Sequence, residues 1–209
     1  MPLAKIDIGA ELEKGWKLFQ PNMGLLIVAG LIATLVSAVT CGILGGPLMA
    51  GMFLMIRRLI RNDPAKPQAG DVFKGFDYFV QSLILVVVCL LAICLLSMIP
   101  VLGQLVCVVV GSVMMWGVLF VTYQNLTAVD AIKKVFALLQ SGEFTMPFIF
   151  GILASLVSGL GLIACVVGVF FTIPIGYCMM ACCYETLFGA EPEAAQPESA
   201  SQPPSDLRL

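Results

Sequence analysis

The chain has 209 residues, of which 60% are hydrophobic and 11% are charged, and its formal net charge is −2. Its mean hydropathy of +1.02 reflects far more apolar surface than a soluble core of this size can bury. The composition excludes a soluble globular domain, and we expect an all-α integral membrane protein that binds no nucleic acid.

The first element is an amphipathic segment from Ile8 to Phe19. Apolar side chains recur along it at helical spacing, while charged side chains occupy the other positions. Asp7 precedes it and is expected to cap the helix. The rings of Trp16 and Phe19 suit the headgroup layer of a membrane. We predict a helix that lies along the membrane interface.

A long apolar run then covers residues 22–60. One helix of this length would extend about 58 Å, nearly twice the hydrocarbon thickness of a bilayer. Glycine and proline between Gly42 and Pro47 therefore predict a turn between two short spans. The second span ends in three arginines, whose side chains can snorkel toward the headgroups: Arg57, Arg58 and Arg61.

Two further apolar runs follow, at residues 80–123 and 144–184. The first is interrupted at 99–104 and the second at 159–168, so each divides into two spans of about 20 residues. Pro174 is a candidate kink site. Together the three runs predict six transmembrane helices, arranged as three hairpins.

A basic and aromatic segment stands before each run. The three copies read KGWKLF at 14–19, KGFDYF at 74–79 and KKVFAL at 133–138. Asp71 is expected to cap the second copy, and Thr127 with Asp130 the third. This periodicity predicts three tandem repeats of roughly 60 residues, each an interfacial helix followed by a hairpin. The predicted repeats cover about 8–62, 71–126 and 128–188.

The basic residues are segregated along the chain. All 11 fall in the N-terminus, the two inter-repeat connections or the C-terminal tail. The positive-inside rule then predicts a cell (inner) membrane protein with both termini in the cytoplasm. The N-terminus lacks the features of a cleavable signal peptide, so the first span is expected to remain. Residues 190–209 are polar and are predicted to form a disordered cytoplasmic tail.

Few groups suited to catalysis are present. The chain has no histidine, and no charged residue falls near the middle of a predicted span, which argues against proton-coupled transport and hydrolysis. We expect no enzymatic activity, no cofactor and no metal site. The eight cysteines lack zinc-site spacing and are interpreted as packing residues, although the adjacent Cys182 and Cys183 leave a redox role open.

The basic residues have two interpretations, as contacts to anionic lipid headgroups or as topology signals. The candidate headgroup contacts are Lys14, Lys17, Arg57, Arg58, Arg61, Lys74, Lys133 and Lys134. The candidate interfacial anchors are Trp16, Phe19, Phe76, Phe79 and Phe136. Small residues at four-residue spacing allow close helix packing and also a homo-oligomer: Gly30, Thr34 and Ala38, and Gly151, Ser155 and Gly159.

Several short motifs point to a known family. They are Lys14-Gly15-Trp16, Gly46-Pro47-Leu48 with Gly51, Asp71-Val72-Phe73-Lys74-Gly75-Phe76, Asp130-Ala131-Ile132-Lys133, Ile173-Pro174 and Tyr184. In this order the chain resembles bacterial multi-pass membrane proteins related to the membrane domain of glycerophosphoryl diester phosphodiesterases, over roughly residues 8–188. The resemblance implies no settled activity, and the phosphodiesterase catalytic domain of some relatives is missing here.

Two functions remain open. The first is a non-catalytic scaffold or lipid-interacting accessory protein of the cytoplasmic membrane. The alternative is a transporter of small molecules or lipids that uses a cavity between the repeats. A continuous polar cavity would favour transport, whereas a dry core would favour the scaffold.

Overall fold

The computed structural model describes residues 6–40, 42–64, 66–96, 102–142, 144–163 and 165–189. All regular secondary structure in these ranges is helical, which confirms the predicted all-α class. The predicted disordered tail at 190–209 lies outside the described residues, as do positions 97–101, which include the start of the predicted break at 99–104.

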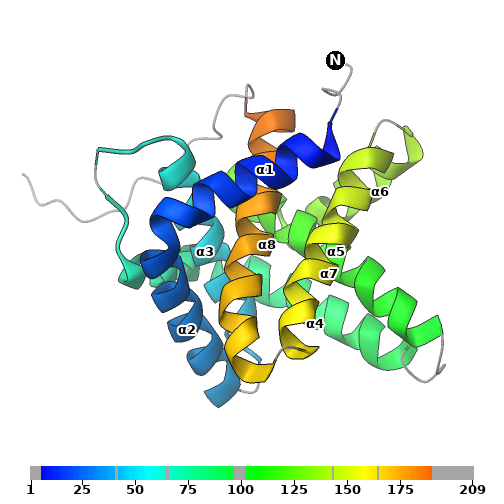
Figure 1. The fold of residues 1–209 in the computed structure, drawn as a ribbon. Coiled ribbons are helices and arrows are strands. Elements are labelled where there is room, and N and C mark those ends of the chain that lie inside the picture. Colours follow the sequence, from blue (N-terminus) through cyan, green and yellow to red (C-terminus); the bar gives the residue numbers. More distant parts are fainter. Residues whose placement is uncertain are drawn as a thin grey trace, which may run out of the picture.

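The first helix, α1 (Ile8–Phe19), begins where the sequence predicts it. The carboxylate of Asp7 accepts hydrogen bonds from two backbone N–H groups of the first turn, at 2.9 and 3.4 Å, which confirms the cap. A short 3-10 turn, η1 (Gln20–Asn22), leads into α2 (Met23–Val39). Figure 1 shows α1 crossing the upper side of the molecule and α2 descending from it.

The predicted break after α2 is confirmed, because α3 (Gly45–Ile60) starts a new helix. Gly42 lies between them with a φ of 84°, a left-handed conformation that favours glycine. Gly46 and Pro47 belong to the first helical turn of α3 and not to the loop between α2 and α3. Proline is tolerated there because the first N–H groups of a helix have no intrahelical partner.

The second amphipathic segment, η2 (Ala69–Tyr78), is a 3-10 helix that continues into α4 (Phe79–Leu96). The expectation that Asp71 is its cap was wrong by three positions. Gln68 is the N-cap, and Asp71 accepts the backbone N–H of Gln68 at 3.0 Å from the third helical position. The two residues form a capping box, in which each side chain accepts a backbone N–H of the other.

The remaining helices are α5 (Leu102–Gln124), α6 (Ala128–Gln140), α7 (Thr145–Ile163) and α8 (Cys165–Phe188). Thr127 caps α6 as predicted, since its hydroxyl accepts the N–H of Asp130 at 3.2 Å. Pro174 lies inside α8. The predicted division of both later apolar runs into two helices is confirmed.

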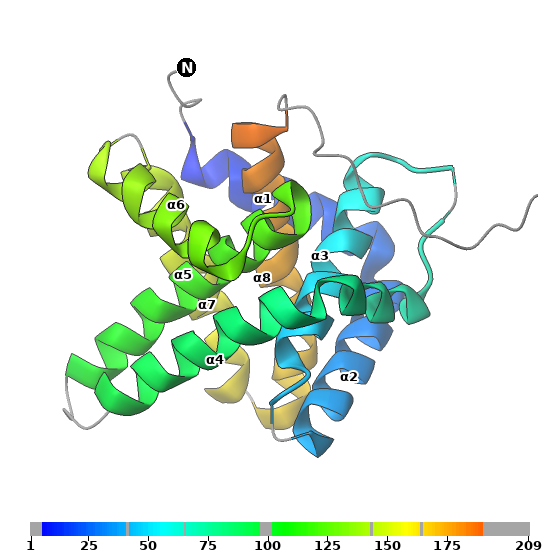
Figure 2. The ribbon, with the colours of Figure 1, turned by 180° about the vertical axis from the view of Figure 1, so that it is seen from behind.

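Three helices form the centre of the bundle, and the other helices pack around them. The central helices α3, α5 and α8 all contact one another. Around them, α1 packs on α8, η2 on α3, and α6 on α5. The helix α2 contacts α3 and α8, α4 contacts α5 and α3, and α7 contacts α8 and α5. Figure 2 shows this bundle from behind, with α4 and α5 slanting away from α2 and α3.

Glycine permits the tightest crossing in the described bundle. A methyl group on Gly75 would overlap the backbone of Pro47 and Gly51, and one on Gly51 would overlap the backbone of Val72. The helices η2 and α3 therefore meet backbone to backbone. Val72 is fully buried in this crossing.

The outward faces of α2, α4 and α7 are apolar. Exposed large side chains line α2, α4 and α7, among them Leu35, Leu91 and Leu156. Within the described residues, three continuous helical stretches are long and apolar enough to cross a membrane. They are Ile8–Val39, which joins α1, η1 and α2, Ala69–Leu95, which joins η2 and α4, and Phe170–Phe188 in α8. A fourth span results if α5 and α6, bent by 118° relative to each other, count as one. These findings support a multi-pass membrane protein.

Candidate functional site: a polar rim with a groove

Polar side chains gather where α3, α5 and α8 end and where the amphipathic helices pack on them. We call this region the polar rim. It consists of Glu11, Lys14, Arg57, Arg58, Arg61, Asp71, Lys74, Gln124, Lys134, Glu185 and Thr186.

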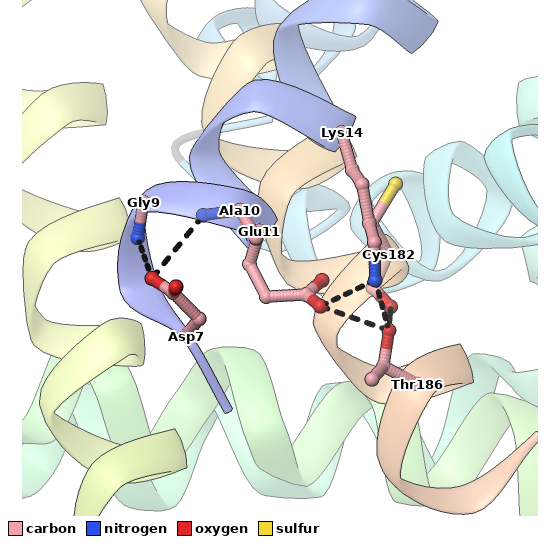
Figure 3. Close-up of polar contacts among 7 residues, drawn as sticks. All are labelled: Asp7, Gly9, Ala10, Glu11, Lys14, Cys182 and Thr186. Atoms are coloured by element: carbon pink, nitrogen blue, oxygen red, sulfur yellow. Dashed lines mark hydrogen bonds and ion pairs between the residues drawn. The ribbon is translucent and has the colours of Figure 1, made fainter. Parts of the chain in front are cut away.

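Between α1 and α8, the rim contains a buried carboxylate (Figure 3). Glu11 is only 2% exposed, and its Oε1 accepts hydrogen bonds from Lys14 Nζ at 2.7 Å and the Thr186 hydroxyl at 3.1 Å. The other oxygen of Glu11 has no hydrogen-bond partner among the described residues. Gly15 allows this approach, because a Cβ there would lie 2.9 Å from the Cα of Met179.

Between α3 and α8, the rim contains a buried ion pair. Arg57 Nε lies 3.2 Å from Glu185 Oε1, and Arg61 Nε lies 3.5 Å from the same oxygen. The Arg57 guanidinium also stacks 4.4 Å above the centre of the Tyr123 ring, which meets the Tyr184 ring edge-on at 4.8 Å. Pairing and stacking compensate for the desolvation of the Arg57 charge.

Between α3 and η2, Asp71 lies 2.8 Å from Lys74 and 3.6 Å from Arg58. Partial burial raises the pKa of the Asp71 carboxyl. Hydrogen bonds from Lys74 and the Gln68 N–H, with the charges of Lys74 and Arg58, outweigh that effect and hold the pKa below its ordinary value. Asp71 is therefore ionised at neutral pH and links η2 to the end of α3.

Between α5 and α6, Lys134 donates a hydrogen bond of 2.6 Å to Gln124 Oε1. Its ammonium also lies 5.1 Å from the centre of the Phe120 ring and 5.8 Å from that of Phe188. Each amphipathic helix thus has a lysine that makes polar contacts at the rim. The lysines of α1 and α6 reach the ends of α8 and α5, while that of η2 binds Asp71, which pairs with α3.

The remaining predicted headgroup contacts face outward. Lys133 is exposed, and Lys17 pairs with Glu13 at 2.6 Å with both side chains mostly exposed. Exposed pairs of this kind stabilise a fold little. Arg57 differs from the sequence expectation, because its side chain is buried against Tyr123 and Glu185 and does not extend toward headgroups.

The predicted aromatic anchors divide into two groups. Trp16, Phe76 and Phe136 are 43%, 37% and 52% exposed. Phe79 is half-buried, and Phe19 is fully buried and stacks on Trp16 at 5.9 Å. Phe19 turns inward because it ends α1, where the chain bends into α2 and its side chain joins the core.

Sequence reasoning missed the partner of Arg57 and the buried role of Glu11. A local signal existed for Glu11, since it and Asp71 each stand three residues before a lysine of the repeated motif, the spacing of side chains that meet on a helix. No local signal connects Arg57 to Glu185, which lie far apart in the chain.

Three described cysteines of α8 fit the packing interpretation. Cys178, Cys182 and Cys183 are buried free thiols, and a buried thiol behaves as a small hydrophobe. Within the part of the chain that the structure describes, no three cysteine, aspartate or glutamate side chains gather as a metal site would require.

Two hollows adjoin these elements. A groove of about 510 Å³ lies between α1, α3 and α8, lined by Lys14, Lys17, Asn62 and Thr186 over an apolar floor. A second cavity of about 410 Å³ lies between α2, α3 and α8 and is lined by small and apolar side chains with Thr34, Ser37 and Tyr177. None of the side chains lining this second cavity is charged.

The small-residue faces predicted from the sequence are partly used within the chain. A Cβ on Gly30 would lie 3.1 Å from the Pro174 ring, and Gly151 packs against Trp116 and Ser112. These two glycines therefore bring helices of one chain together, as α2 with α8 and α7 with α5.

Comparison with known proteins adds no family to this description. No protein family model, no curated protein and no solved structure matches the chain. Its function is therefore argued from the polar rim and the groove themselves.

Proposed function

We propose that this chain is a six-span, non-catalytic protein of the cytoplasmic membrane that binds anionic phospholipid along its polar rim. The observation that carries the proposal is the way in which the three amphipathic helices are docked. Each packs its buried face on a central helix and leaves an exposed aromatic ring and basic side chains outside: Trp16 with Lys17, Phe76 with Lys74, and Phe136 with Lys133.

The cyclic packing supports the six spans in three repeats. Each proposed repeat is an amphipathic helix followed by a hairpin: α1 with α2 and α3, η2 with α4 and α5, and α6 with α7 and α8. The amphipathic helix of each unit packs on the second hairpin helix of the preceding unit, and α1 closes the ring by packing on α8. Related sequences that fold alike make such equivalent contacts.

Matching residues support the same arrangement. Tyr123 and Tyr184 open the similar endings YQNL and YETL of α5 and α8, and their rings are in contact. Arg57, near the end of α3, stacks on Tyr123. Gly15 and Gly75 follow the repeated lysine, and both stand at close helix crossings.

The proposed orientation places the polar rim in the cytoplasm, because the basic residues of the described chain lie near it. Single cysteines at Lys66 and Val129, both exposed, should react with an impermeant maleimide only from the cytoplasmic side. A cysteine at the exposed Ile43 should react only from the other side. External labelling at Lys66 would contradict this topology.

Lipid binding is tested with the full chain purified in detergent. Native mass spectrometry should show retention of phosphatidylglycerol over phosphatidylcholine, because each basic side chain near a headgroup contributes about 1 kcal/mol. A variant with glutamine at Lys17, Lys74 and Lys133 should lose this preference. Unchanged retention in a correctly inserted variant would show that the lysines act as topology signals only.

The proposal of a non-catalytic protein is supported by the state of the rim carboxylates. Asp71 and Glu185 are each engaged by two basic side chains, and Glu11 by a lysine. A carboxylate held by basic side chains of its own chain is poorly placed to take a proton from a substrate.

A transporter is the second candidate, and the cavity of about 410 Å³ between α2, α3 and α8 favours it. Its uncharged lining suits an apolar or uncharged molecule. Filling it by Ala33→Phe should block uptake of such a molecule into proteoliposomes if the cavity transports it. Uptake equal to that of empty liposomes for both proteins would reject transport of the molecule tested.

A further inference from the structure

We propose that the groove between α1, α3 and α8 is the principal binding site for one anionic phospholipid. In this site Lys14 and Lys17 hold the phosphate, and the apolar floor carries the start of an acyl chain. The inference rests on the proposed lipid-binding function and assigns that function to one place on the rim.

The two lysines are placed to share one phosphate. They stand three residues apart on α1 and both line the groove, and side chains at this spacing lie on one helix face. The side chains are 52% and 70% exposed. The partner of Lys17 is the exposed Glu13, so a phosphate can replace that carboxylate at little cost.

One carboxylate, that of Glu185, lines the groove, and its negative charge is balanced by two arginines. Glu185 pairs with Arg57 at 3.2 Å and with Arg61 at 3.5 Å. The groove lining therefore contains two lysines and one carboxylate, and that carboxylate is already paired with two arginines. The excess of positive charge favours an anionic ligand over a cationic one.

An uncharged donor completes the polar wall. Asn62 follows α3 with a φ of 50°, a conformation that asparagine tolerates better than most residues, and it lines the groove with Thr186. The Asn62 amide N–H₂ can donate to phosphate or ester oxygens, whereas the hydroxyl hydrogen of Thr186 is directed to Glu11 Oε1 and the Cys182 carbonyl. A phosphodiester and its glycerol esters offer such acceptors together.

The floor distinguishes a lipid from a free phosphate. Leu18, Leu59 and Ile60 line the groove and are all half-buried. Methylene groups placed against them leave water, at a gain of roughly 25 cal/mol per Å² of apolar surface buried. Inorganic phosphate makes no such contact, so the groove fits an amphiphile.

The lysines of the other amphipathic helices do not line the groove. Lys134 is half-buried against two phenylalanine rings, and Lys74 binds Asp71 at 2.8 Å. Lys133 is exposed and does not line the groove. Lys74 and Lys133 therefore provide a matched control of equal charge.

The test measures the affinity of short-chain phosphatidylglycerol for the full chain in zwitterionic detergent, at low salt. The double variant K14Q/K17Q should bind about 25-fold more weakly, at about fivefold per lysine, and K74Q/K133Q should change affinity less than threefold. A thermal unfolding curve checks that each variant is folded. The single variant Lys17→Gln should bind the lipid about fivefold more weakly. It alters only the exposed pair with Glu13 and leaves the Lys14 partner of the buried Glu11 in place.

The outcomes separate the two proposals. Equal losses of lipid affinity in both double variants would contradict the assignment of the groove as the principal site, while lipid binding along the rim would still hold. No loss in either would overturn both. Leu59→Trp should fill the floor and weaken lipid binding at least tenfold, and displacement of the lipid by millimolar inorganic phosphate would overturn the assignment to an amphiphile.

Discussion

The contact of α1 with α8 and the contact of η2 with α3 each contain a copy of the repeated Lys-Gly sequence, but the two contacts are stabilised differently. At η2 the glycine brings two backbones together, with Gly75 against Pro47 and Gly51, and the ion pairs lie at the edge. At α1, Gly15 lies against both the flexible side chain and the backbone of Met179, and a buried carboxylate bridges the helices. One motif therefore supports a steric and an electrostatic form of helix docking.

The largest expected effect concerns the buried ion pair between α3 and α8. Glu185→Gln leaves the Arg57 guanidinium buried beside an uncharged amide, and loss of one partner of a buried pair costs about 3–5 kcal/mol. Unfolding in detergent should show this loss. Arg61→Gln is the control, because its side chain is 40% exposed, and should cost less than about 1 kcal/mol. Equal effects would contradict the burial of the Arg57 pair.

The steric form is tested at the crossing of η2 and α3. Gly75→Ala places a methyl group in the backbone of α3 and should lower the free energy of unfolding by about 3 kcal/mol. Gly24→Ala is the control, since no atom lies within 4 Å of a Cβ there, and should be neutral or stabilising by up to about 1 kcal/mol. A tolerated alanine at Gly75 would contradict the close crossing.

Gly15→Ala sharpens the comparison. The nearest atom to the new methyl group is the Cγ of Met179 at 2.7 Å, with the Met179 backbone at 2.9 Å. Part of the overlap can be relieved by the methionine side chain. We expect a loss of about 1–2 kcal/mol, smaller than at Gly75. The same denaturation assay measures it, and a larger loss than at Gly75 would reverse the comparison.

The smallest effect is the pH dependence at Asp71. Its folded pKa lies below the ordinary 3.8, so its contribution to stability is fully present above that pH. The contribution disappears as the pH falls through the lowered folded pKa. Comparing Asp71→Asn with the parent protein should show a difference of less than about 1 kcal/mol at pH 7 that shrinks as the pH falls below the ordinary value of 3.8. A difference independent of pH would exclude the ionic role.

The sequence determined the features that depend on neighbours in the chain. Asp7 and Thr127 cap helices because their side chains reach N–H groups two or three residues away. Gly42 occupies the turn between α2 and α3 for an equally local reason, its positive φ. The three repeats, the six spans and the family resemblance stay predictions, although the packing of α1, η2 and α6 supports the repeats.

Only the tertiary structure decided which of the chemically similar residues have a buried role. Arg57 and Arg58 are adjacent in the sequence, yet Arg57 is buried against Tyr123 and Glu185 while Arg58 stays partly exposed beside Asp71. Trp16 faces outward, whereas Phe19, three residues later on the same helix, is buried in the core. Local spacing fixes the face of a helix on which a side chain lies. Which element covers that face depends on contacts between helices far apart in the chain, such as α1 with α8.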